Sequence, residues 1–140
     1  MAYSISRVVR FSFGSHASTA LGSVEYDFRP RRIILLRHGQ SLGNVDASSY
    51  VKTADWRIPL TELGRQQACE AGKQIRDQVG VDDGQQFLFY YSPYLRTQET
   101  LREIQRFIPN EQIISEREDP RISEQQLGNF QNVEEVLEAK

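Results

Sequence analysis

Three side chains suited to binding an oxyanion follow two apolar stretches of the chain. Arg37 and His38 come directly after Ile33–Leu36, and Arg96 follows the apolar stretch at residues 87–91. An arginine guanidinium presents a fork of N–H donors that matches the paired oxygens of a phosphoryl group. Two permanent cations beside a histidine favour its neutral imidazole, which is a nucleophile. This combination predicts attack of His38 on phosphorus, with the arginines stabilising charge on the transferring group.

The apolar stretches are typical of strands in an α/β fold. We expect strands at residues 33–36, 87–91 and 112–115. The first is a continuous apolar run, so we expect it to be buried on both faces. Strands that alternate with helices predict a mostly parallel sheet. Such sheets bind ligands at the carboxyl ends of their strands, where Arg37, His38 and Arg96 would share one edge.

Three helices are expected between and after these strands. Thr61 is a candidate N-cap for a helix that ends at Gly80. Small and apolar residues recur on one face of this helix, which would let it lie close against a sheet. Ser92 and Pro93 are typical of the N-cap and first residue of a second helix, whose buried stripe would consist of Leu101, Ile104 and Ile108. A third helix is expected over residues 133–139.

The composition favours one folded domain and disfavours several classes of protein. Of the 140 residues, 39% are hydrophobic and 26% are charged. No apolar run approaches the length of a membrane span, and a formal net charge of -2 gives no general attraction for nucleic acid. Cys69 is the one cysteine, so we interpret it as a small hydrophobic residue and not as a reactive thiol. We expect no metal and no other cofactor.

The first 30 residues differ in composition from the rest of the chain. Residues 1–24 contain arginines and several serines but no acidic residue, which is similar to an organellar transit peptide. A disordered extension explains the same composition, and the sequence leaves both open. We expect an extension over residues 1–30 and a folded part over 31–140. The expected location is the cytoplasm, or a chloroplast or mitochondrion if the extension is a transit peptide.

Four ordered segments resemble the histidine phosphatase superfamily, also called phosphoglycerate mutase-like. They are IILLRHGQSLGN (33–44), LTELGRQQA (60–68), SPYLRTQET (92–100) and DPRISEQQLGNF (119–130). The resemblance implies a three-layer phosphoglycerate mutase-like α/β fold, and the last segment is most similar to plant and fungal members. It implies His38 as the phosphorylated nucleophile and Glu124 as the proton donor. It also implies phosphate contacts from Arg37, Arg96 and Asn44.

Two departures from the family pattern affect the expected activity. The segment around Glu124 differs from that of the glycolytic mutases, which favours phosphomonoester hydrolysis over mutase-type phosphotransfer. Family members also supply a second pocket histidine from nearer their C-terminus, and this chain ends at Lys140 without such a segment. We therefore expect a C-terminally truncated chain with an incomplete fold and weak activity.

A catalytically impaired phosphate-binding or interaction protein is the alternative to a phosphatase, and a mutase-type phosphotransferase is a third interpretation. A small phosphorylated metabolite is the expected ligand. The sequence predicts neither a nucleic-acid nor a membrane partner, and it leaves the oligomeric state open.

Overall fold

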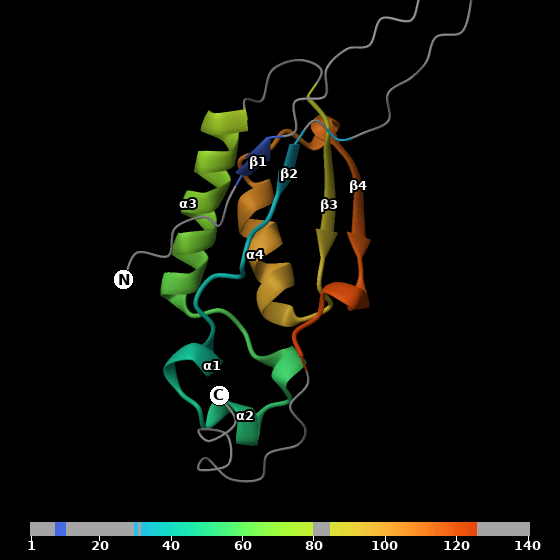
Figure 1. Cartoon of the computed structure of the whole chain (residues 1–140). Coiled ribbons are helices and arrows are strands. Elements are labelled where there is room, and N and C mark those ends of the chain that lie inside the picture. The colour runs from blue at the N-terminus through green and yellow to red at the C-terminus, as the bar shows by residue number, and fades with distance from the viewer. Residues whose placement is uncertain (1–7, 11–29, 31, 80–84, 126–140) are drawn as a thin grey trace, which may run out of the picture. The chain divides into compact units, whose positions relative to one another are not determined.

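The structure, a computed structural model, describes residues 8–10, 30, 32–79 and 85–125 (Figure 1). The chain divides into two compact units, Met1–Arg37 and His38–Lys140. The predicted helix over residues 133–139 lies outside the described residues. Of the helices that are described, none is long and apolar enough to cross a membrane.

Two short strands form an antiparallel pair in the first unit. β1 (Val8–Arg10) pairs with β2 (Arg32–Ile34), which falls on the predicted strand at 33–36. The prediction that this strand is buried on both faces is wrong, since Ile33 is 43% and Leu35 is 60% exposed. Alternate side chains of an extended segment point to opposite sides, and one of these sides is open to solvent.

β1 lies within the N-terminal extension predicted over residues 1–30. Most of that extension lies outside the described residues, so its interpretation as a transit peptide or disordered segment stays a prediction.

The second unit contains a parallel strand pair joined by a helix. β3 (Phe87–Tyr91) leads into α4 (Leu95–Gln105), and β4 (Ile113–Glu118) returns parallel to β3. α3 (Glu62–Val79) contacts α4, which lies between α3 and the strand pair (Figure 1). This strand–helix–strand arrangement confirms the predicted α/β class and the two later strands.

Short helices fill the connections of the second unit. They are α1 (Leu42–Val45), α2 (Ser49–Lys52) and the 3-10 helices η1 (Asp55–Arg57), η2 (Asn110–Gln112) and η3 (Pro120–Ile122). The first three lie between the loop at His38 and α3, so this connection is partly helical.

α3 begins where its sequence predicts. The Thr61 hydroxyl accepts a hydrogen bond from the Gly64 amide at 3.0 Å, which is the pattern of an N-cap. One face of the helix, with Ala68 and Ile75, is buried. The small residues of this face pack closely on α4, whereas a sheet was the predicted partner: a Cβ added at Gly72 would lie 2.6 Å from the Phe107 ring.

α4 starts two residues later than the sequence predicts. Tyr94 is the N-cap residue, with extended backbone angles (φ -69°, ψ 135°). The Ser92 hydroxyl accepts a bond from the Tyr94 amide at 3.4 Å, and the Thr97 hydroxyl lies 2.7 Å from the Ser92 carbonyl. Ser92 and Pro93 therefore form a bend before the helix, because the Ser92 side chain satisfies a local amide. Arg96 lies in the first turn, as predicted.

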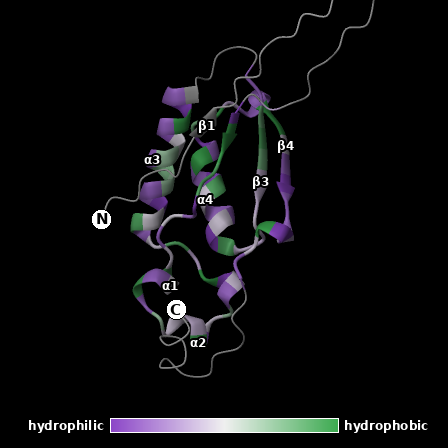
Figure 2. Ribbon diagram, in the orientation of Figure 1, coloured by the Kyte–Doolittle hydropathy of each residue, from purple (hydrophilic) through white to green (hydrophobic). Residues whose placement is uncertain are grey.

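Burial alternates along the strand pair. The Phe87 and Phe89 rings stack on the less exposed face, with centroids 6.2 Å apart. Leu88 and Tyr90 are exposed on the opposite face of β3, and Ile114 of β4 is also exposed. Figure 2 shows that β4 changes from hydrophobic at its start to hydrophilic at its end. The core of this unit lies instead around α4: the predicted apolar stripe is buried, with Leu101 and Ile104 in the helix and Ile108 just after its end.

Candidate active site

A hydrogen bond within the loop sets the tautomer of His38. Its Nδ1 lies 2.6 Å from the Gly39 carbonyl oxygen. A carbonyl oxygen only accepts, so Nδ1 carries a proton and donates it to this bond. In the neutral ring the lone pair then lies on Nε2, which makes Nε2 the nucleophilic nitrogen.

Two glycines bring this loop into backbone contact with α3. A Cβ added to Gly39 would overlap the Gly64 carbonyl, and a Cβ added to Gly64 would overlap the Gln40 carbonyl. Neither position leaves room for a side chain, so both must be glycine for the loop to lie on the first turn of α3.

Side chains at the start of α3 hold Gln40, the residue after Gly39. The Gln40 amide donates to Gln67 Oε1 at 2.8 Å, and the Gln40 carbonyl accepts from the Thr61 amide at 2.9 Å. The Thr61 hydroxyl also donates to Gln40 Oε1 at 2.9 Å. The segment LTELGRQQA therefore supports the His38 loop directly.

α4 supports the same loop through Thr100. The Thr100 hydroxyl accepts a hydrogen bond from the Gly39 amide at 3.2 Å and donates one to the Arg96 carbonyl at 2.7 Å. Thr100 is buried, so these bonds are shielded from water.

Glu99 joins α4 to the start of α3. Its carboxylate accepts from the Leu60 amide at 2.7 Å and pairs with Arg65 Nη2 at 2.6 Å. The Glu99 side chain is mostly buried, whereas the Arg65 side chain is 38% exposed. A buried carboxylate needs such partners, and here they fix the two helices around the His38 loop.

Arg96 is buried and paired with Asp55. Its Nη1 lies 2.7 Å from Asp55 Oδ1 and 2.8 Å from the Asp55 carbonyl oxygen, and its guanidinium lies over the Tyr94 ring, 4.7 Å from the centroid. Among the described residues, the hydrogen bonds of this guanidinium are made by Nη1. Phosphate binding by Arg96 stays a prediction.

Replacing Asp55 by alanine should destabilise the chain by about 1.5–3 kcal/mol, the range for hydrogen bonds to charged groups. The buried Arg96 guanidinium would lose the Asp55 carboxylate and keep the bond to the backbone carbonyl of residue 55. Urea unfolding of Asp55→Ala beside Asp55→Asn, which retains an acceptor oxygen, measures this. Equal stability of Asp55→Ala and the unchanged chain would show that the pair contributes nothing.

Three further predicted site residues lie at exposed positions. Arg37 is exposed and ends the first unit. Asn44 is exposed, and its Oδ1 accepts bonds from the amide and hydroxyl of Ser41 at 2.9 and 3.0 Å, which caps α1. Glu124 is exposed near the end of the described residues. The phosphate-binding roles of Arg37 and Asn44 and the proton-donor role of Glu124 stay predictions.

Sequence reasoning does not find Asp55, Glu99 or Thr100. Asp55 lies in a connection without a periodic pattern, so no signal marks it. Glu99 and Thr100 follow Arg96 by three and four positions, a spacing that places all three on one helix face. Within the segment SPYLRTQET, that spacing could have predicted that both residues lie beside Arg96.

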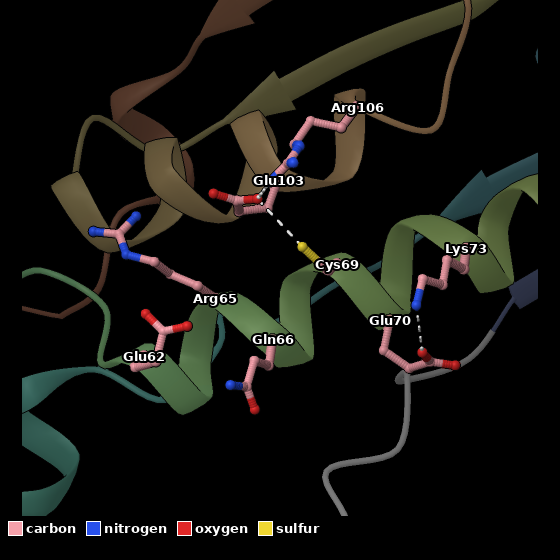
Figure 3. A pocket seen from close by; sticks show the side chains of 8 residues that line it. All are labelled: Glu62, Arg65, Gln66, Cys69, Glu70, Lys73, Glu103 and Arg106. Atoms are coloured by element: carbon pink, nitrogen blue, oxygen red, sulfur yellow. Dashed lines mark hydrogen bonds and ion pairs between the residues drawn. The ribbon is translucent and has the colours of Figure 1, made fainter.

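A groove between α3 and α4 contains Cys69 (Figure 3). The half-buried thiol donates a hydrogen bond to Glu103 Oε2 at 3.2 Å. Burial, followed by the bond to this carboxylate, raises the pKa of the Cys69 thiol. A bond from Arg106 is the main cause that lowers the pKa of Glu103. The raised pKa favours the thiol over the thiolate, and the interpretation of Cys69 as an unreactive residue stays a prediction.

Iodoacetamide should alkylate Cys69 more slowly in the folded chain than after unfolding in urea. A raised pKa leaves less thiolate at any given pH, and thiolate is the reactive form. Glu103→Gln removes the carboxylate, so alkylation of the folded variant should be faster than that of the folded unchanged chain. It should stay slower than that of the unfolded chain, because the thiol is still half-buried. Mass spectrometry of timed samples measures the rate; equal rates in folded and unfolded chains would contradict the protected thiol.

The sequence of the folded part identifies the class of protein. Residues 33–140 match the histidine phosphatase superfamily (branch 1), and the chain belongs to this superfamily. The resemblance drawn from the four sequence segments is confirmed. In the described part of the chain, no group of three or more histidine, cysteine, aspartate or glutamate side chains is placed to hold a metal ion.

Two proteins of Arabidopsis thaliana are similar to this chain. It is 50% identical over 114 residues to the phosphoglycerate mutase-like protein AT74H, across 77% of this chain and 40% of that protein. It is 44% identical to the phosphoglycerate mutase-like protein AT74, across 79% of this chain and 36% of that protein. The chain thus spans less than half the length of these relatives. A solved structure of the protein histidine phosphatase SixA complexed with tungstate is 23% identical over 56% of this chain and 43% of that chain, with a TM-score of 0.41.

Proposed function

We propose that this chain hydrolyses a phosphomonoester through a phosphohistidine formed on His38. The observation that carries the proposal is the bond from His38 Nδ1 to the Gly39 carbonyl, because it leaves the lone pair of the neutral ring on Nε2. Membership of the histidine phosphatase superfamily supports a reaction of phosphatase or mutase type.

The reaction proceeds in two displacements on phosphorus. Nε2 of His38 attacks phosphorus while the bond to the ester oxygen breaks, and Glu124 gives its proton to the leaving oxygen. Water then attacks the phosphohistidine, and the Glu124 carboxylate takes up a proton from that water. Phosphate leaves, and both His38 and Glu124 return to their starting states.

Cations and amide groups offset the charge of the transferring group. Arg37, Arg96 and Asn44 contact its oxygens in this proposal. The Asp55 contact supports the role of Arg96, because it fixes Nη1 and directs the remaining donors of the guanidinium. The reaction needs no metal, since the arginines supply the positive charge.

The proposed substrate is a small phosphorylated metabolite, and no nucleic acid or membrane takes part. The chain acts in the cytoplasm, or in a chloroplast or mitochondrion if residues 1–30 are a transit peptide.

Phosphate release from para-nitrophenyl phosphate by the 140-residue chain, with EDTA present, tests the proposal. Release above the uncatalysed rate is the expected result. A folded chain, checked by circular dichroism, that binds inorganic phosphate but releases none would contradict hydrolysis and favour a catalytically impaired phosphate-binding protein. Transfer between metabolites that needs a bisphosphate primer, without free phosphate, would favour a mutase.

A further inference from the structure

A continuous path of hydrogen bonds joins α4 to the ring of His38. The Thr100 hydroxyl donates to the Arg96 carbonyl at 2.7 Å and accepts from the Gly39 amide at 3.2 Å. The Gly39 carbonyl in turn accepts from His38 Nδ1 at 2.6 Å. Thr100 therefore contacts the residue that sets the tautomer of His38, although it does not contact the reacting nitrogen through these bonds.

Gly39 is the residue of this path whose backbone is least restricted by its own structure, because glycine has the widest range of backbone conformations. Its carbonyl orients the imidazole only if its own backbone is held. The close approach to Gly64 and the bond from the Gln40 amide to Gln67 restrict the Gly39 carbonyl from the side of α3. The bond to Thr100 restricts the Gly39 amide from the side of α4. A hydroxyl at position 100 is well suited to this contact, since it donates and accepts at once.

We propose that Thr100 is a positioning residue for His38, acting through both polar groups of Gly39. The proposal rests on the proposed function, in which Nε2 of His38 is the nucleophile. Loss of the hydroxyl frees Gly39 to turn its carbonyl away from Nδ1. The ring then samples the tautomer protonated on Nε2, which has no lone pair to attack phosphorus.

The chain offers a matched control on the same helix. The Thr97 hydroxyl donates to the Ser92 and Tyr94 carbonyls at 2.7 and 2.6 Å, so it also bonds the backbone but does not reach Gly39. Thr97→Val removes a comparable hydroxyl without breaking the path. Thr100→Ser keeps the hydroxyl of the path and loses only a methyl group.

Thr100→Val, Thr100→Ser and Thr97→Val should be compared with the unchanged full chain in two measurements. Nitrogen NMR of the histidine rings reports the tautomer without needing activity. The chain has two histidines, and His38→Ala identifies the His38 signals. Phosphate release gives kcat and KM separately, and urea unfolding gives the stability of each variant.

Thr100→Val is expected to move His38 away from the tautomer protonated on Nδ1. It should also lower kcat by about tenfold to a hundredfold, the effect of a small misplacement of a reacting group, with KM changed little. Thr100→Ser should restore both properties, and Thr97→Val should leave both unchanged. An unchanged tautomer and kcat in folded Thr100→Val would overturn the proposal.

The two measurements separate this proposal from the proposed function. A tautomer change in Thr100→Val, in a chain that releases no phosphate, supports positioning by Thr100 while the proposed hydrolysis fails. Phosphate release that depends on His38 but is equal in Thr100→Val and Thr97→Val overturns positioning while hydrolysis stands.

Discussion

Replacing His38 by alanine is expected to lower phosphate release by about four orders of magnitude or more, as for removal of other covalent nucleophiles. The structure places a proton on Nδ1 and a lone pair on Nε2, and no other side chain in the proposed reaction forms a bond to phosphorus. The chain should carry covalent phosphate during turnover, and the His38→Ala variant should carry none. Phosphohistidine survives base and is lost in acid, so treating the quenched protein with each identifies it.

His16→Ala is the matched control for this experiment. His16 is the other histidine of the chain and lies outside the described residues. Its replacement should leave the covalent phosphate and its release unchanged. Base-stable phosphate that persists on His38→Ala but is absent from His16→Ala would identify His16 as the nucleophile and contradict the role of His38.

Replacing Gly64 by alanine should displace the His38 loop and destabilise the chain. The new Cβ would overlap the Gln40 carbonyl, which is backbone and has no rotamer to move aside. Overpacking of this kind costs about 1–3 kcal/mol. Alanine regains ~1 kcal/mol of helix propensity over glycine, so the net loss of stability is smaller than the cost of overpacking alone. We expect kcat to fall by at least about tenfold.

Gly72→Ala separates loop displacement from general overpacking. A Cβ at Gly72 would press on the Phe107 ring and on Ile104 of α4, far along α3 from the loop. Both variants should lose stability in urea unfolding, but only Gly64→Ala should change the ring-nitrogen signals of His38 and lower kcat sharply. Equal changes at His38 in the two variants would argue against a local role for Gly64.

Local patterns in the sequence predict the main elements of the second unit. The Thr61 cap and the small-residue face define α3, and the stripe of Leu101, Ile104 and Ile108 defines the buried side of α4. Burial of the first strand is predicted wrongly, because an apolar run reveals a preference for burial and not what lies beside the strand. The start of α4 is predicted early, because Ser92 forms a local turn that competes with helix capping.

The candidate site is predicted less completely than the fold. His38 and Gly39 stand out through their motif, but Asp55 pairs with a residue 41 positions away and Glu99 with one 39 positions away. Local periodicity says nothing about such pairs. These buried charged groups meet their partners only in the folded chain, so the pairs cannot be predicted from local patterns in a single sequence.

The order in which the site assembles follows from the separation of its contacts. The Gly39 amide bonds a residue 61 positions later, and the Gln40 amide bonds one 27 positions later. The entropy cost of closing each loop rises with the logarithm of its length, so these contacts form when the two helices dock rather than within the loop itself. A nascent chain that has not yet extended past Thr100 lacks the partner that holds Gly39, so the histidine is synthesised early but oriented late.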